Sequence, residues 1–127
     1  MKKIIILILI IITLTTICIL FQKQYKYPIG RDTYDAFGDG SFQLGKYYII
    51  NSSGESEKKI ALLFRGETLE REVFEYFTYL NFLFTHGKNG YVICDYEKNR
   101  YNIYNDLDDI PYEYNKIIKN HKFYQIK

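Results

Sequence analysis

The first hydrophobic stretch of the chain runs from Ile4 to Phe21 and contains no charged residue. Its polar side chains are three threonines, whose hydroxyls can bond to backbone carbonyls of the preceding helical turn. About 18 residues at roughly 1.5 Å each give a helix of about 27 Å, close to the hydrocarbon thickness of about 30 Å. The pattern predicts an N-terminal transmembrane helix over residues 1–21 in which Ile4 to Phe21 spans the membrane.

The end of this stretch bears on whether the helix is removed after export. The residues at the end of the apolar run and just after it, Ile19–Lys23, include no small residue of the kind that a signal peptidase needs. Lipid attachment at Cys18 would need a small residue before it, but Ile17 occupies that position. We therefore expect an uncleaved signal-anchor in which Cys18 faces lipid as a small apolar side chain. A secreted protein or a lipoprotein is the alternative.

The charges on the two sides of the span give a weak orientation signal. Lysines and an arginine flank it, at Lys2 and Lys3 before the span and at Lys23, Lys26 and Arg31 after it. A very short segment before a first hydrophobic stretch is typical of an export signal. The predicted topology is single-pass in the cell membrane, with a cytoplasmic N-terminus. Residues 22–29 form a juxtamembrane tether, and residues 30–127 form one small β-rich extracytoplasmic domain.

The first part of this domain predicts a loop and a hairpin. Residues 32–41 are dense in Asp and Gly, which favour turns, and predict an entry loop. Phe42–Leu44 and Lys46–Asn51 are rich in aromatic and β-branched residues and predict a strand with a bulge at Gly45. The remainder of the hairpin is a polar connection and a second strand, Ser52–Lys58 and Lys59–Arg65.

The stretch Thr68–His86 fits two patterns. One set of apolar residues recurs at helical spacing, namely Leu69, Val73, Phe77, Leu80 and Phe84. Another set alternates with period two, namely Phe74, Tyr76, Thr78, Leu80, Phe82 and Phe84. From Val73 onward most residues have poor helix propensity, and a helix would be apolar on all sides. We expect two strands, Val73–Tyr79 and Phe82–His86, with one helix as the alternative.

Shorter apolar runs follow, separated by polar turns. The Asn89-Gly90 pair predicts a tight hairpin turn that pairs Lys88 with Tyr91, which would place His86 opposite Ile93. The strands on this side of the turn are Tyr91–Tyr96 and Tyr101–Asn105.

The C-terminal part predicts a helix. The acids and the proline of Asp106–Pro111 are typical of a helix start. Its inward stripe is formed by Tyr114, Ile117, Ile118 and His121, and Phe123–Ile126 can add an edge strand. The predicted fold is therefore α+β and mainly β: the transmembrane helix, a small antiparallel meander sheet and a short C-terminal helix.

Three segments together resemble small membrane-anchored proteins of unknown function from low-GC Gram-positive bacteria. They are Phe37–Gln43, Gly90–Tyr96 and Tyr101–Leu107. The resemblance implies no activity, but it favours strands in Thr68–His86.

Charge and cysteine content exclude some classes of function. The chain has 17 basic and 15 acidic residues, and Lys2 and Lys3 precede the span, so the remainder carries 15 of each sign. A neutral domain lacks the basic surface that nucleic-acid binding requires, and we expect no nucleic-acid partner. Cys94 is the only cysteine beyond the anchor, so the domain forms no internal disulfide.

Three glycine-rich or acidic segments are candidates for ligand binding. Asp35–Gly40 begins like a calcium loop, but Phe37 and Lys46 occupy positions that need oxygen ligands. Gly38–Gln43 begins like a phosphate-binding loop, but it lacks the third glycine. The acids Asp106, Asp108 and Asp109 are explained by a helix start. We expect no metal and no cofactor.

Nucleophilic catalysis would require Cys94 beside His86 or His121, with a carboxylate such as Asp95 to orient the histidine. In the predicted hairpin His86 and Cys94 face opposite sides of the sheet, because the residue opposite His86 is next to Cys94. We expect no catalytic residue and no enzymatic activity.

Aromatic residues indicate the remaining class of function. Fourteen tyrosines and nine phenylalanines exceed what one small core can bury, and exposed tyrosine is favoured at protein interfaces. The predicted function is a membrane-tethered protein-binding module, for example an immunity-type protein, at an interface whose residues the sequence leaves unknown. An accessory subunit of a membrane complex and a cell-wall hydrolase with unrecognised carboxylates are the alternatives.

Overall fold

A computed structural model describes residues 1–21, 26, 27 and 29–126 of the chain. The first element is the helix α1, Lys2–Phe21, and its segment Lys2–Leu20 is long and apolar enough to cross a membrane. Thr13 Oγ1 donates a hydrogen bond to Leu9 O at 2.9 Å, and Thr16 Oγ1 donates to Ile12 O at 2.8 Å, as predicted from the sequence. Most of the predicted tether, residues 22–29, lies outside the described residues.

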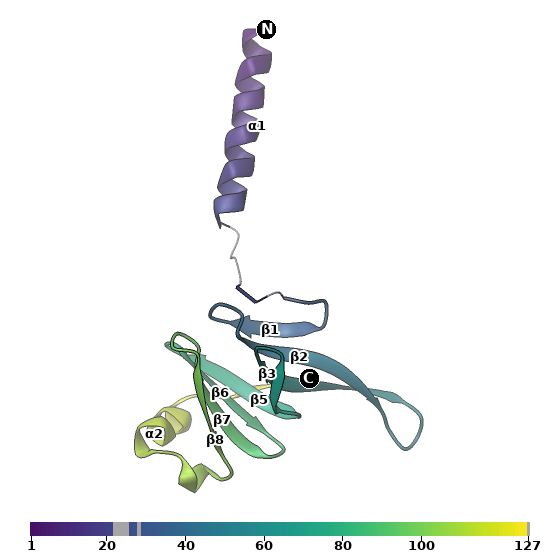
Figure 1. The fold of residues 1–127 in the computed structure, drawn as a ribbon, viewed down its shortest axis with the longest axis vertical. Coiled ribbons are helices and arrows are strands. Elements are labelled where there is room, and N and C mark those ends of the chain that lie inside the picture. Colours follow the sequence, from purple (N-terminus) through teal and green to yellow (C-terminus); the bar gives the residue numbers. More distant parts are fainter. Residues whose placement is uncertain (22–25, 28, 127) are drawn as a thin grey trace.

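The strands form two antiparallel sheets (Figure 1). The first sheet has the order β1-β2-β3-β4, with β1 Thr33–Phe37, β2 Phe42–Ile50, β3 Ser56–Phe64 and β4 Glu67–Glu70. The second sheet has the order β8-β7-β6-β5-β9, with β5 Val73–Tyr79, β6 Phe82–Gly87, β7 Gly90–Asp95, β8 Arg100–Tyr104 and β9 Tyr124–Gln125. A 3-10 turn and a helix stand between β8 and β9, namely η1 Leu107–Asp109 and α2 Tyr112–Asn120.

Two apolar clusters hold these layers together. The cluster between the two sheets contains Phe37, Phe42, Leu44, Ile60, Leu62, Val73, Leu83, Val92 and Cys94. The cluster between the second sheet and α2 contains Phe77, Phe84, Ile93, Ile110 and Ile118. The second sheet is therefore covered on both faces, which explains why its central strands read as nearly continuous apolar runs.

A polar link also joins the two sheets. Tyr76 on β5 donates a hydrogen bond from its hydroxyl to Asp35 Oδ2 on β1, at 3.2 Å. Partial burial, together with the nearby Asp35 carboxylate, raises the pKa of Tyr76 to about 12.

The predicted fold class is confirmed, and so are the two strands in the ambiguous stretch. β5 and β6 begin at the predicted residues, and β9 is an edge strand, as expected, with β5 as its partner. The division of the strands between two sheets was not predicted, and neither was β4. The helix also differs in detail: the acids 106–109 belong to η1 and its N-cap, and α2 begins only after Pro111.

Three predictions for the first part of the domain were wrong. The supposed entry loop contains β1, because Thr33–Phe37 pairs with β2 despite its turn-favouring neighbours. Gly45 is not a bulge, since it pairs in register with Ala61; the irregularity lies between Thr33 and Asp35 on the neighbouring strand. β3 also begins at Ser56, inside the predicted polar connection.

The predicted register of the β6–β7 hairpin was wrong by two residues. Gly87 pairs with Gly90, and His86 pairs with Tyr91 rather than Ile93. Gly90 has a φ of 123°, and a Cβ at this position would lie 2.3 Å from Tyr104 O. The glycine is therefore required as the first residue of β7. A shift of two residues preserves the faces, so His86 and Cys94 still point to opposite sides of the sheet.

Candidate protein-binding surface

The β2–β3 hairpin extends beyond the rest of its sheet (Figure 1). β1 pairs with β2 only up to Gly45, and β4 pairs with β3 only from Leu62 onward. The pairing between β2 and β3 nevertheless continues without a register shift to Ile50 and Ser56. We call residues 46–60 the arm, a two-stranded ribbon without a neighbouring strand on either edge beyond its base.

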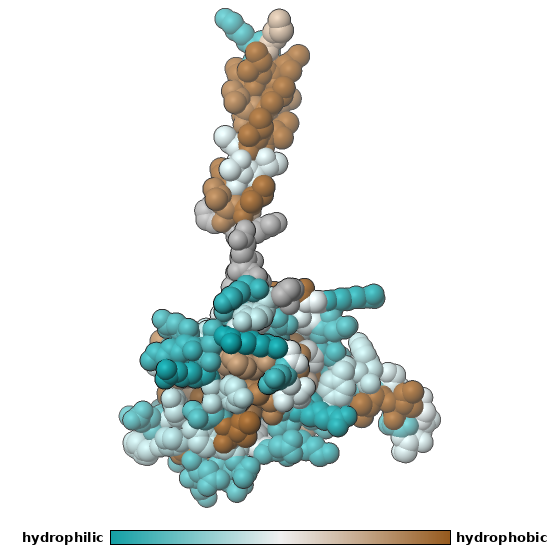
Figure 2. All heavy atoms as spheres, viewed as in Figure 1, coloured by the Kyte–Doolittle hydropathy of each residue, from teal (hydrophilic) through white to brown (hydrophobic). Residues whose placement is uncertain are grey.

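The arm carries an apolar stripe that the second sheet does not cover. On β2, Phe42 and Leu44 are fully buried between the sheets. Tyr48 and Ile50 lie on the same face by the period of two, yet they are 64% and 79% exposed. Figure 2 shows the hydrophobic patch on the projecting hairpin, away from the main body. Apart from Lys46, which lies between Leu44 and Tyr48 on this face, the apolar face of β2 thus continues into solvent.

The tip of the arm is closed by a network around Asn51. Asn51 Oδ1 accepts hydrogen bonds from Ser53 N at 3.1 Å and from Glu55 N at 2.9 Å. Asn51 N donates to Glu55 O at 2.9 Å. These bonds satisfy the turn internally and hold the exposed residues before it in a defined position.

An ion-pair network joins the arm to the main body. Lys59 Nζ lies 2.8 Å from Glu57 Oε1 and 2.7 Å from Glu72 Oε1. Hydrogen bonds to Glu57, the larger effect, and to Glu72 raise the pKa of Lys59, because both stabilise its charged form. Beside it, a groove of about 400 Å³ runs between the arm and the second sheet, lined in part by Ile60, Val73, Phe74 and Ile126.

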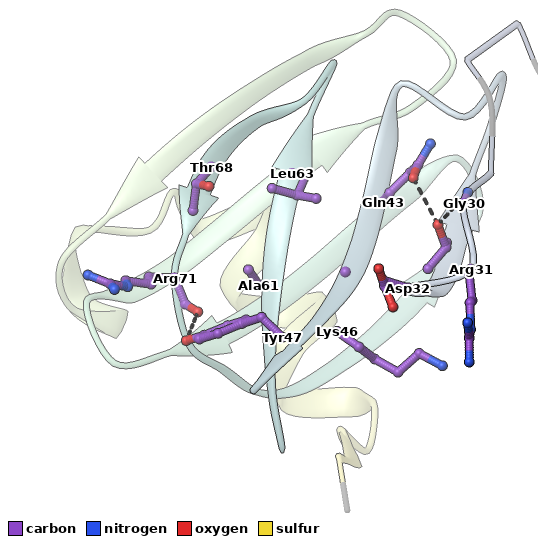
Figure 3. A pocket seen from close by; sticks show the side chains of 12 residues that line it. Gly30, Arg31, Asp32, Gln43, Lys46, Tyr47, Ala61, Leu63, Thr68 and Arg71 are labelled. Atoms are coloured by element: carbon purple, nitrogen blue, oxygen red, sulfur yellow. Dashed lines mark hydrogen bonds between the residues drawn. The ribbon is translucent and has the colours of Figure 1, made fainter. Parts of the chain in front are cut away.

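A second hollow, which we call the outer pocket, lies on the opposite face of the first sheet. It has a volume of about 430 Å³. Two small residues that pair with each other, Gly45 and Ala61, form its floor and leave space above the sheet. A Cβ on Gly45 would approach Leu63 Cδ1 to 2.9 Å. Figure 3 shows Ala61 and Leu63 in the middle, with Thr68 and Arg71 on one side and Arg31 and Asp32 on the other.

Hydrogen bonds fix the walls of the outer pocket. The Tyr47 hydroxyl donates to Arg71 O at 2.7 Å, which closes one end. On the other wall, Gly30 N donates to Thr33 Oγ1 at 3.1 Å, and this hydroxyl donates to Gln43 Oε1 at 3.2 Å. The pocket is therefore preformed by side chains that already have defined positions.

The rim of the outer pocket is basic. Arg31, Lys46 and Arg71 line it together with a single acid, Asp32. Within the described residues, no ion pair joins any of the three cations to a carboxylate. The pocket thus combines an apolar floor with two net positive charges, an arrangement suited to a ligand that is apolar and acidic.

The structure does not bring the sequence-proposed nucleophile and base together. Cys94 is fully buried between the sheets, and burial raises the pKa of its thiol, so that it stays protonated and unreactive. His86 lies on the other face, where its Nδ1 is 2.9 Å from Glu75 Oε1 and its ring stacks on Tyr91. His121 ends α2 and stacks on Phe77.

The carboxylates considered for metal or base chemistry have structural partners. Asp35 Oδ1 accepts from Ala36 N at 2.8 Å, and Asp39 Oδ1 accepts from Ser41 N at 3.0 Å. Asp95 Oδ1 accepts from Asn81 Nδ2 at 2.8 Å and from Lys98 N at 3.0 Å. Among the described residues, no three His, Cys, Asp or Glu side chains are grouped as a metal site would require.

Sequence reasoning missed a buried acid. Glu70, at the end of β4, is 2% exposed, and its Oε1 accepts hydrogen bonds from Glu72 N at 3.0 Å and from Asn89 Nδ2 at 3.2 Å. Its Oε2 accepts from Asn89 N at 3.0 Å. This carboxylate joins the first sheet to the β6–β7 turn, and nothing in the pattern around Glu70 signals its burial.

Comparison of the chain with protein-family models, with curated proteins and with solved structures gave no match. The arm and the outer pocket therefore stand on their geometry alone. The resemblance to anchored proteins of low-GC Gram-positive bacteria stays a prediction.

Proposed function

We propose that this chain is a membrane-tethered module without catalytic activity that binds a protein partner through its arm. The uncovered stripe of Tyr48 and Ile50 carries the proposal. Large apolar side chains exposed side by side cost solvation free energy, and such patches on a well-packed protein mark interaction sites. A tyrosine beside an isoleucine, framed by polar residues, also resembles the centre of a protein interface.

The shape of the arm supports a protein rather than a small molecule as its ligand. A two-stranded ribbon that projects from the main body offers two faces and two strand edges, which suits contact with a large surface. Its turn is closed by Asn51, so little conformational entropy is lost when the arm binds.

The tether completes the proposal. We infer that α1 is retained as an anchor, with the N-terminus in the cytoplasm and the strands outside the membrane. The length and apolar character of α1 support an anchor, and the absence of a small residue before Lys23 argues against cleavage. An immunity-type protein that intercepts a toxin at the cell surface is one form of this function.

Photocrosslinking in intact cells tests the role of the arm. We expect a benzophenone amino acid in place of Tyr48 to give a crosslinked protein complex, whereas the same group in place of Tyr112 should not. Tyr112 is the matched control because it is 81% exposed but lies on α2. Adding Ile50→Glu should abolish the crosslink from position 48, since it places a charge in the apolar stripe.

A second control distinguishes the arm from any exposed apolar residue. Ile103 on the edge strand β8 is 52% exposed, and Ile103→Glu should leave the crosslink from position 48 intact. Equal crosslinking from positions 48 and 112, or equal loss with both glutamate variants, would contradict the proposal.

A further inference from the structure

The backbone of the arm leaves hydrogen-bonding groups free along the outer edge of β2. In an antiparallel pair, alternate residues of a strand direct their N–H and C=O groups to the same neighbour. Asn51 N donates across the hairpin to Glu55 O at 2.9 Å, whereas Lys46 N donates away from β3, at 2.6 Å, to the carbonyl that precedes β1. Odd-numbered residues of β2 therefore bond to β3, and the N–H and C=O groups of Tyr48 and Ile50 point outward. Within the described residues, no strand pairs with this edge beyond Lys46.

The free edge of β2 also lacks the charges that usually protect an exposed strand. Natural sheets place charged side chains, above all lysine, on edges that must not pair with another chain. Residues 47–54 contain no charged side chain. On the opposite edge of the arm, Lys58 pairs with Tyr48, is exposed and directs its N–H outward, and its neighbours in sequence are Glu57 and Lys59. The β3 edge is thus protected by charge, and the β2 edge is open to another strand.

We propose that the partner protein contributes an extended segment that pairs with the free edge of β2 as an added strand. The inference rests on the proposed function, because it names the mode by which the arm binds its partner. The groups complementary to a row of free N–H and C=O groups are those of another strand. The exposed side chains of Tyr48 and Ile50 would pack on one face of that strand, and Ile49, which is 37% exposed, on the other. The segment is therefore uncharged and apolar on both faces.

The free edge has a defined length. The hydrogen bond of Lys46 to the start of β1 closes it at one end, and the turn around Asn51 closes it at the other. Between these limits the outward groups are the N–H and C=O of Tyr48 and of Ile50, so a short strand is enough to fill the edge. The ladder between β2 and β3 holds these groups in an extended row before the partner arrives.

Proline substitution tests the added strand, because proline has no N–H and its ring obstructs a neighbouring strand. With the benzophenone group at position 48 in intact cells, Ile50→Pro should lower the crosslink about tenfold. Ile50→Val is the matched control, since valine has as many side-chain carbons as proline but keeps the N–H, and it should leave the crosslink close to its original level. Lys58→Pro removes the outward N–H of the opposite edge and should also leave the crosslink unchanged.

The outcomes separate this inference from the proposed function. If Ile50→Pro leaves the crosslink intact, or if Ile50→Val or Lys58→Pro lowers it equally, the partner does not pair with the β2 edge. The proposed binding function then stands, with side-chain contacts alone. If position 48 crosslinks to nothing beyond the Tyr112 control, both proposals fail. The urea midpoint of each variant in detergent is the folding control, and it should stay near that of the wild type because neither substituted N–H belongs to the β2–β3 ladder.

Hydrogen exchange of the wild-type chain gives a second readout that needs no substitution. In detergent, the amides of Tyr48 and Ile50 should exchange about tenfold faster than those of Tyr47 and Ile49, which face β3. Addition of the partner protein that the position-48 crosslink identifies should slow exchange at Tyr48 and Ile50 to the level of their neighbours. Equal exchange at all four amides of the free chain, or no added protection with the partner, would overturn the inference.

Discussion

At the scale of single residues, the most consequential side chain is the buried Glu70. A carboxylate out of contact with water is tolerated only when donors surround it, and here a side-chain amide and two backbone N–H groups supply them. These donors come from the β4–β5 connection and from the β6–β7 turn, so Glu70 couples the two sheets. The free-energy cost of burying the Glu70 carboxylate is offset by these hydrogen bonds, which also hold the two turns in place.

Glu70→Gln should lower the free energy of unfolding by about 1–3 kcal/mol, because one acceptor oxygen becomes an NH₂ group that faces a donor. Urea denaturation of the full chain in detergent measures the change. Glu67→Gln is the matched control, since Glu67 is exposed on the same strand and its replacement should have little effect. Equal effects of the two substitutions would mean that the hydrogen bonds to Glu70 contribute nothing.

At the scale of elements, the two hairpins of the second sheet are built differently. The β6–β7 turn places Gly90 at a φ that disfavours other residues. The β5–β6 turn has no glycine, and Leu80 adopts a φ of 54° while it is 75% exposed. This turn is held instead by its surroundings: the Tyr96 hydroxyl donates to Leu80 O at 2.6 Å, and Tyr96 N donates to Asn81 O at 3.0 Å.

Leu80→Gly should raise the free energy of unfolding by about 0.5–1 kcal/mol, because it relieves the left-handed conformation by more than the added chain entropy costs. The urea midpoint reports the change. Lys88→Gly in the next turn is the control: Lys88 has no positive φ, so only the entropic cost applies and the midpoint should fall. A lower midpoint for Leu80→Gly would show that the side chain contributes more than its exposure suggests.

At the scale of the whole molecule, two layers of strands and one helix cover each other while α1 and the arm remain uncovered. The apolar surface of α1 matches a lipid environment in length and composition. The arm is short and carries only a few apolar residues, so it suits a protein contact. The two uncovered features therefore have separate roles in the proposed function, one as an anchor and one as a binding surface.

The proposed anchor makes a prediction for the intact molecule. The chain should leave the membrane fraction with detergent but not with high salt or alkali, and its intact mass should include residues 1–21 with an unmodified Cys18. External protease on sealed cells should remove the strands. A mature protein that begins after Phe21, an acylated Cys18 or a protected strand region would contradict the proposed topology. Deletion of residues 2–21 is the control and should abolish membrane association.

Local pattern was sufficient for most of the secondary structure. The uncharged run became α1, and the alternation from Val73 to His86 became two strands, because aromatic side chains pack well on a pleated surface. The Asn89-Gly90 pair marked the hairpin but not its register. That register depends on Gly90, whose φ brings its backbone close to Tyr104 on β8, a contact that no local pattern contains.

What the sequence determined by itself was thus the long apolar helix, the strand-rich class and the faces of the central strands, since these follow from hydrophobic period and local propensity. Only the tertiary structure decided that the strands divide into two sheets, that β1 pairs with β2, and that Glu70 is buried. It alone also showed that β2 and β3 extend beyond β1 and β4, which leaves Tyr48 and Ile50 exposed to solvent. The physical reason is that burial depends on where covering strands end, and that is set by contacts between residues far apart in the chain.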